Sequence, residues 1–290
     1  MDNNLNFGRN IILTVANGDE GIVIENLRID FVVNKNDKKK ANTAEISIYN
    51  LSGLTRKKIL REFKGVELRA GYGENVDILF VGYIRTSKVV KRGSDIVLTL
   101  KAGEGDFDFK TKVINKTYIK TAIQEVLQDL VSRYSDLTSG LFDRIDEIPI
   151  PQRPIVLSGT IFDAINTLSD RYGFKWSVNN NNIDFRKNEA VHEGSFYIDS
   201  NSGLVGIPEQ GQNDLLKITA LLNPLFTLGR LIKVRSKFLE EIQLANNNPK
   251  KEETEGDSGV FRIDTIIHRG SNYGGFEFYS ILECRRYVPS

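Results

Sequence analysis

The chain has 290 residues and a nearly balanced charge, with 39 basic and 38 acidic side chains. That balance argues against long-range attraction to nucleic acid or to an anionic membrane. A single cysteine excludes an intrachain disulfide and every zinc site built on cysteine pairs, and only two histidines remain for metal or acid–base chemistry. We therefore expect no metal, no cofactor and no enzymatic activity.

The sequence shows no targeting segment. No apolar run approaches the roughly 18 residues of a membrane span, and the first ten residues lack the basic start and apolar core of a secretory signal. We expect a protein that is kept in the cytoplasm unless a larger particle carries it out, and no membrane partner. The length allows two or three domains of roughly 100–150 residues each.

Residues 1–106 predict a first β-barrel domain. Ile11, Leu13 and Val15 alternate with polar neighbours, as in a strand with one buried face. Further strands are expected at residues 22–33, 44–49, 66–70, 76–84 and 96–101. The lysine-rich segment 34–40 is expected to be a solvated loop. Closely spaced strands with one short helix are typical of a closed or nearly closed barrel.

The one helix of this domain is expected from Gly53 to about Phe63, with Ser52 as its N-cap. The side chains expected to point inward are Leu54, Ile59, Leu60 and Phe63. Those expected to point outward are Arg56, Lys57, Lys58 and Arg61.

Residues 107–190 predict a mixed α/β insert domain. An apolar stripe that begins at Ile119 predicts a helix from about Tyr118 to Arg133. A second unit follows, with a strand at residues 155–157, a helix at 161–172 and a hairpin at 174–185. Thr160 is the expected N-cap of that helix, with Asp163 at the capping-box position, and Gly173 is its expected end.

This unit resembles in part the small glycan-binding LysM-like folds. In that interpretation Trp176 stacks on a sugar. The alternative is that Trp176 packs on the adjacent helix, as an aromatic residue in a hairpin more often does.

Residues 191–290 predict a second β-barrel domain with a flexible loop at 245–259. Leu215 to Leu222 is an apolar run, and Gly229 begins a strand with Ile232 and Val234 on one face. Closing strands are expected at 260–267 and 276–286. His268 is expected in the turn between them, hydrogen-bonded rather than bound to a metal, and Cys284 in the core. The loop is polar and free of aromatic residues, so it cannot bury enough surface to fold alone.

Several stretches resemble one protein family. Gly203–Lys237 contains Gly-Leu-Val-Gly-x-Pro-Glu, then Leu-Leu-Asn-Pro and a Gly-Arg-Leu-Ile strand. It is similar to the second barrel of the baseplate hub proteins of contractile-tailed phages, the Mu-like hub and late control protein D group. Ala70-Gly71-Tyr72 followed by Leu79–Ile84 resembles their first barrel. Two further stretches, Ala44–Leu54 and Phe261–Cys284, resemble the same family. These are patterns of turns and strands, so the resemblance carries over no catalytic residue.

The resemblance implies a mainly β fold with an α/β insert (α+β), in which two related β-barrel domains flank a mixed helix–hairpin domain. It also implies a virion structural protein of the tail baseplate that is assembled in the host cytoplasm. Three copies would form a pseudo-sixfold ring that joins a hexameric tail tube to a trimeric central spike. The implied partners are the chain itself, the tail tube protein, the central spike protein and other baseplate proteins.

The outward face of helix 53–63 and the loop 246–258 are the expected subunit contacts. The candidate interface residues are Arg56, Lys57, Arg61, Lys250 and Glu252. Lys233, Arg235 and Lys237 alternate on one strand face. They either face a central channel through which DNA passes or form an ordinary solvated face, and the sequence leaves both interpretations open.

Other functions remain as alternatives. A tail-associated peptidoglycan hydrolase would need an acid in a cleft, and the clustered candidates are Glu104, Asp106 and Asp108. Their surroundings carry no sequence signature of an apolar pocket that raises a pKa. Asp106 and Asp108 would share a face if they lay on a strand. A peptidoglycan-binding protein, a type VI secretion spike protein and the hub of a phage-tail-like bacteriocin complete the alternatives.

Overall fold

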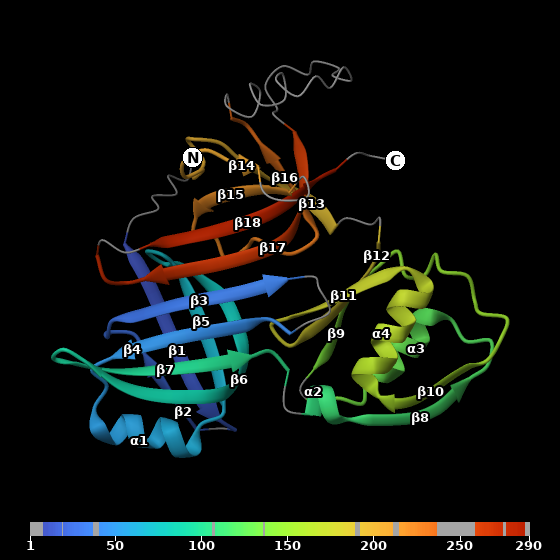
Figure 1. Cartoon of the computed structure of the whole chain (residues 1–290), viewed down its shortest axis with the longest axis horizontal. Coiled ribbons are helices and arrows are strands. Elements are labelled where there is room, and N and C mark those ends of the chain that lie inside the picture. The colour runs from blue at the N-terminus through green and yellow to red at the C-terminus, as the bar shows by residue number, and fades with distance from the viewer. Residues whose placement is uncertain are drawn as a thin grey trace.

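The computed structural model contains a large β-sheet with a smaller mixed unit at its side (Figure 1). The structure describes residues 8–18, 20–36, 41–105, 108–135, 137–188, 192–210, 215–236, 259–274 and 277–287. The side chains of residues 108, 109, 192 and 193 are not included.

The large sheet has 13 strands, drawn from both ends of the chain. Its main path runs β14-β15-β18-β17-β3-β4-β7-β6-β5-β1-β2, and β16 also joins β17 and carries β13. Its N-terminal strands are β1 (Arg9–Asn17), β2 (Glu20–Ile24), β3 (Ile29–Asn36), β4 (Thr43–Tyr49), β5 (Gly65–Tyr72), β6 (Asn75–Arg92) and β7 (Asp95–Gly103). Its C-terminal strands are β13 (His192–Ile198), β14 (Glu209–Gln210), β15 (Leu215–Leu221), β16 (Arg230–Val234), β17 (Val260–Ser271) and β18 (Phe278–Arg286).

Alternation along the strands builds the core, as the period-two patterns predict. Ile11, Leu13 and Val15 of β1 are buried on one face, and Ile232 and Val234 of β16 are buried likewise. Cys284 is a buried core residue as expected. The mainly β fold is therefore confirmed.

The two strand-rich halves form one continuous sheet because β3 pairs antiparallel with β17. The ladder runs from Thr265 opposite Asn36 to Ser271 opposite Asp30. Tyr72 and Phe278, one from each half, pack edge to face with ring centroids 5.2 Å apart. The halves therefore share both a hydrogen-bonded ladder and part of a hydrophobic core.

The smaller unit lies beside the sheet and has its own hydrophobic cluster (Figure 1, green and yellow). Helices α3 (Ile123–Val131) and α4 (Ile161–Tyr172) accompany two small sheets. The strands of these sheets are β8 (Val113–Tyr118), β9 (Thr138–Asp143), β10 (Ile155–Thr160), β11 (Phe174–Asn179) and β12 (Asn182–Lys187). The short helix α2 (Asp108–Thr111) leads into the unit.

Helix α4 begins and ends where its capping residues predict. Thr160 Oγ1 accepts a 3.1 Å hydrogen bond from the Asp163 backbone N–H, and Gly173 closes the helix in the left-handed conformation, with φ 69°. The hairpin of β11 and β12 follows directly, as predicted.

The predicted helix 118–133 is too long. Tyr118 ends strand β8, and α3 begins only at Ile123. Lys120 has a positive φ of 47°, which interrupts regular structure before the helix. Ile119 consequently leaves the apolar stripe and is 68% exposed.

Helix α1 (Gly53–Glu62) forms with Ser52 as its N-cap, but its buried face is narrower than predicted. Ile59 and Phe63 are buried, whereas Leu54 is 84% exposed and Leu60 is also exposed. At 3.6 residues per turn, Leu54 lies about 140° around the helix from Ile59 and Leu60 about 100°. The prediction that Leu54 and Leu60 point inward is wrong.

Two further predictions about polar residues, the loop position of Lys35 and the turn position of His268, are wrong. Lys35, assigned to a solvated loop, is a buried residue of β3. His268 lies inside β17 rather than in a turn, fully buried, with Nδ1 2.9 Å from Ser280 Oγ. Asp108 begins helix α2 rather than lying on a strand, and Asp106 lies outside the described residues.

Candidate functional site

A polar cluster lies where the two halves of the sheet meet. Asp30 of β3 accepts hydrogen bonds from Arg28 (3.0 and 3.2 Å), from Tyr49 (2.8 Å) and from Ser271 of β17 (2.6 Å). The Arg28 guanidinium also lies over two aromatic rings, 4.1 Å from the centroid of Tyr49 and 5.1 Å from that of Tyr273. This arrangement fixes β3 against β17.

The charge state of Asp30 follows from these contacts. Partial burial disfavours the charged carboxylate, but hydrogen bonds from Arg28, Ser271 and Tyr49 outweigh burial and hold the pKa of Asp30 below its usual value. Asp30 is therefore ionised at neutral pH.

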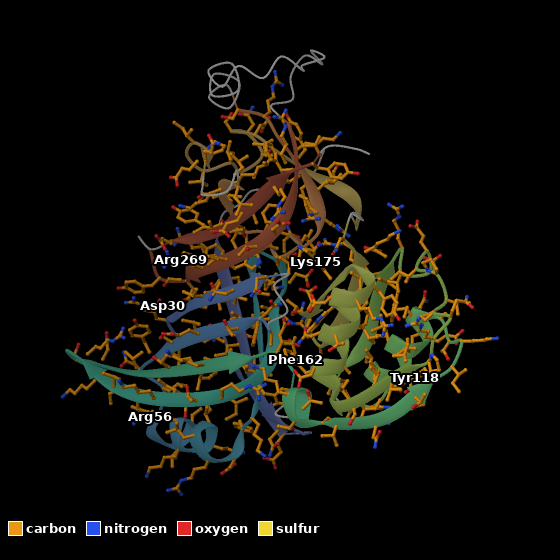
Figure 2. The ribbon with its side chains drawn as sticks, turned by 45° about the vertical axis from the view of Figure 1, so that its right-hand side comes forward. Asp30, Arg56, Tyr118, Phe162, Lys175 and Arg269 are labelled. Atoms are coloured by element: carbon orange, nitrogen blue, oxygen red, sulfur yellow. The ribbon has the colours of Figure 1, made fainter. Side chains whose placement is uncertain are left out.

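An open groove runs over the outer face of β3, β4 and β17 beside this cluster. Its charged side chains are Asp30, Glu45, Arg269 and Glu277. Figure 2 shows Asp30 and Arg269 on the same side of the sheet, on neighbouring strands. Arg269 pairs with Glu277 at 2.9 Å, and Glu45 with Lys101 at 3.3 Å. Asp30 pairs with Arg28 at 3.0 Å, so each charged side chain of the groove has a partner of opposite charge.

Helix α1 presents the predicted basic face at one end of the sheet, where Figure 2 labels Arg56. Lys57 and Arg61 are exposed, and Arg56 is partly buried because its guanidinium donates to the Leu51 carbonyl at 3.2 Å. With Leu54 exposed beside these cations, the helix offers a mixed apolar and basic surface. The structure thus places the three predicted α1 interface residues on one helix.

The structure describes only some of the predicted channel-facing residues and none of the predicted interface residues in the loop 246–258. Lys233 is half-buried in β16, and Arg235 is exposed just beyond the end of that strand. Lys237, Lys250 and Glu252 lie outside the described residues.

Trp176 is not placed to bind a sugar. Only 2% of it is exposed, and its indole N–H donates to Asn166 Oδ1 at 3.1 Å. Its ring packs edge to face on Phe162 of α4 at 5.5 Å. The helix-packing interpretation of Trp176 is confirmed, and the sugar-stacking one is wrong.

Glu104 does not lie in an open cleft. Burial raises the pKa of its carboxyl to about 8, although nearby Lys35 and hydrogen bonds from Asn180 and Asn42 act in the opposite direction. The sequence near Glu104 has no signature of a pocket that raises a pKa, yet its carboxyl accepts from Asn180, in the turn between β11 and β12 and 76 residues away. Because this contact comes from a distant part of the chain, the residues next to Glu104 give no indication that its carboxyl is buried.

The described part of the chain holds no group of three or more His, Cys, Asp or Glu side chains placed to share a metal ion. Within the same residues, no helix is long and apolar enough to cross a membrane.

Comparison with solved structures shows a shared fold with tail proteins. The 43 kDa tail protein of prophage MuSo2 from Shewanella oneidensis matches with a TM-score of 0.63 and 8% identity, over 96% of this chain and 98% of that one. A tail protein from Neisseria meningitidis MC58 matches with a TM-score of 0.64 and 10% identity, over 97% of each chain. No curated protein matches the sequence.

A third similar structure comes from a secretion machine. It is an E. coli component of the type VI secretion system, described as structurally similar to the T4 bacteriophage tail proteins gp27 and gp5. Its TM-score is 0.60 at 10% identity, over 95% of this chain and 77% of that one. At such low identity these likenesses show the fold alone.

Sequence comparison with protein families gives the assignment. The family described as baseplate hub gp41 matches residues 10–243, which is most of the chain. The match spans β1 to β16 and includes the whole smaller unit. The chain therefore belongs to the baseplate hub gp41 family of structural phage tail proteins.

Proposed function

We propose that this baseplate hub protein assembles as a homotrimer whose ring joins the hexameric tail tube to the trimeric central spike. Its role is structural and not catalytic. Each chain would supply two β-barrel units to the ring, from residues 1–106 and 191–290, with residues 107–190 as an insert at the outside. Three chains with two units each would present six units to the hexameric tube. The same three chains would match the three chains of the spike.

The observation that carries this proposal is the β3–β17 ladder. It fuses the two strand-rich halves side by side in one sheet, so a single subunit already contains a pair of neighbouring units. A chain built this way can match a sixfold partner with three copies. The separate hydrophobic cluster of residues 114–185 supports an insert that stands apart from the ring.

Unpaired strand edges support contact between subunits. β2 and β14 end the strand order of the sheet. Among the described residues, Arg85–Arg92 of β6 pair only with β7, which leaves their second edge open. Open edges present backbone N–H and C=O groups that a neighbouring chain can pair. A ring of copies would cover them.

The charges at two of these edges are complementary. The open part of β6 carries Arg85, Lys88, Lys91 and Arg92, whereas the exposed acidic side chains beside β2 include Glu20 and Glu25. We place one subunit contact there and a second on α1, at Arg56, Lys57 and Arg61. Lys250 and Glu252 are proposed for the same ring contact from the loop 246–258.

Lys233, Arg235 and Lys237 are proposed to face the channel of the ring. Side chains of this sign would lie along the path of DNA. The near-zero net charge of the chain keeps such an attraction weak, which suits passage rather than retention. A tail-like bacteriocin hub would use the same assembly without DNA.

The direct test is assembly with the proposed partners. The purified chain is mixed with the tail tube protein and with the central spike protein of the same particle, and complexes are separated by size-exclusion chromatography with light scattering. The expected result is a complex with three hub chains for each spike trimer, which also retains the tube protein. Failure to bind either partner would overturn the proposal.

A further inference from the structure

Three buried polar residues lie where three neighbouring strands meet the insert: Lys35 in β3, Asn42 just before β4 and Glu104 just after β7. The β3–β4 ladder ends with Asn34 opposite Thr43, and Lys35 and Asn42 are the next residues along the two segments. The β4–β7 ladder pairs Thr43 with Gly103, and the Glu104 N–H continues it by donating to the Asn42 carbonyl at 3.0 Å. Lys35, Asn42 and Glu104 therefore form a row at the ends of β3, β4 and β7.

All three side chains are inside the protein. Lys35 is 3% exposed, and Asn42 and Glu104 are each 1% exposed. Side chains of directly opposed residues start from Cβ atoms about 5 Å apart, which is within the reach of a lysine. The opposite charge that acts most strongly on the Lys35 amine is the Glu104 carboxyl.

The Asn42 side-chain amide is held in a defined orientation. Its Oδ1 accepts from the Asn36 backbone N–H at 3.1 Å. Its Nδ2 donates to Glu104 Oε2 at 2.9 Å and to the Val178 carbonyl at 2.6 Å. A hydrogen bond to the amide oxygen polarises Cγ, and the amide nitrogen lies against a carboxyl group. This arrangement favours nucleophilic attack at Cγ.

Burial sets the protonation states of the other two groups. Burial lowers the pKa of the Lys35 amine, which favours the neutral, nucleophilic form, although Glu104 acts in the opposite direction. Burial raises the pKa of Glu104 to about 8, so its carboxyl is protonated at neutral pH. Fully buried His268 is neutral because burial, and then Lys35, lower its pKa. Asp77 acts on Lys35, and Asp184 acts on Glu104, only as more distant charges.

We propose that Lys35 and Asn42 join in an intramolecular isopeptide bond, with Glu104 as the acid–base group. The lone pair of Lys35 Nζ attacks Asn42 Cγ, and the Cγ–Nδ2 bond breaks. Glu104 gives its proton to the departing Nδ2 and takes one from Nζ, so it ends the reaction unchanged. The product is a secondary amide between β3 and β4, and one ammonia molecule leaves. No oxidant or cofactor is needed.

The bond would secure the end of the β3–β4 hairpin where it meets the insert. Glu104 Oε1 accepts from the Asn180 backbone N–H at 3.1 Å, and Asn42 binds the Val178 carbonyl, so the same row holds the tip of the β11–β12 hairpin. A cross-link that closes so short a loop adds little to global stability. Its effect is local, because β3 and β4 can no longer separate at this end.

The test is the intact mass of the folded wild-type chain, followed by a tryptic peptide map. The expected mass is lower than the sequence mass by one ammonia molecule. The map should contain a branched peptide in which Lys35 is joined to Asn42, and trypsin should not cleave after Lys35. A wild-type chain at its full sequence mass overturns the proposal, and this result does not depend on any variant folding.

Variants distinguish the isopeptide bond from other reactions that release ammonia. Lys35→Arg should restore the full mass, because arginine cannot form the amide. A succinimide formed at Asn42 alone would persist in Lys35→Arg, and that outcome would also overturn the proposal. Glu104→Gln should slow bond formation about 100-fold or more. The control is Lys101→Arg on β7, whose lysine pairs with Glu45 at the surface and which should keep the wild-type mass.

Discussion

Ser271 of β17 donates a 2.6 Å hydrogen bond to Asp30 of β3, across 241 residues of sequence. The contact joins the two halves of the chain at their shared ladder. The same carboxylate accepts from Arg28 and Tyr49, so one side chain ties together β3, β4 and β17. Hydrogen bonds to a charged group are among the stronger polar contacts, at about 1.5–3 kcal/mol each.

Asp30→Asn should therefore destabilise the fold by roughly 2 kcal/mol, since it removes the charge from several of these hydrogen bonds. The folded-state pKa of Asp30 lies below the value of 3.8 for a free aspartate. The carboxylate thus contributes stability above that value, and the contribution disappears as the pH falls through the folded pKa. Urea unfolding of wild type and variant should differ at pH 7 and converge in acid.

The matched control is Asp146→Asn, an exposed aspartate in the insert. It should unfold like the wild type at both pH values. An Asp30→Asn variant as stable as the wild type at pH 7 would contradict the role assigned to the cluster.

Gly71 of β5 is required by close approach of the backbone. A Cβ atom there would lie 1.9 Å from the Asn75 carbonyl oxygen, far inside van der Waals contact. Gly71→Ala should cost at least about 2 kcal/mol, because the tight turn after β5 has to move. Gly53→Ala is the control, since a Cβ on this residue of α1 meets nothing within 4 Å. Thermal unfolding of both variants measures the difference, and equal melting temperatures would refute this explanation.

The caps of α4 should each contribute measurably to the insert. Thr160→Ala removes the acceptor for the Asp163 N–H and should cost about 1 kcal/mol. Gly173→Ala places a Cβ on a residue with φ 69° and should cost a similar amount, about 1 kcal/mol. Ser158→Ala, on an exposed face of β10, should have little effect. Hydrogen exchange of the insert amides reports these changes directly, and unchanged protection in the cap variants would count against the assignment.

The basic face of α1 should matter for assembly and not for folding. Lys57→Glu with Arg61→Glu reverses two exposed charges and should weaken subunit association at least tenfold, about 1.4 kcal/mol. Circular dichroism should remain that of the wild type. Arg153→Glu, an exposed residue of the insert, is the control and should assemble normally. Normal assembly of the double variant would remove α1 from the proposed interface.

Local signals determined which elements could be predicted from sequence. The β10–α4–β11–β12 unit follows its prediction because Thr160, Gly173 and the asparagine-rich turn each act on neighbouring backbone. The period-two pattern correctly predicted the buried faces of β1 and β16 for the same reason. The resemblance to hub proteins identified the family, which no pattern of single residues could do.

Long-range relationships could not be predicted. The β3–β17 ladder and the Asp30 cluster join residues more than 200 positions apart, and no sequence feature near either strand identifies the strand with which it pairs. β6 runs on to Arg92, well past the predicted end near residue 84, and a register shift near Thr86 interrupts its alternation. Lys35 did carry a signal: it shares the alternation of Ile29, Phe31 and Val33, but its lysine-rich surroundings masked that pattern.

The measurement that tests the central claim most directly is the mass of the chain in solution, by light scattering across a concentration series, alone and with the spike protein. A hub trimer has three times the chain mass of 32.7 kDa. We expect that species, either alone or once the spike is added. A chain that stays monomeric at every concentration and also fails to trimerise with the spike would contradict the account.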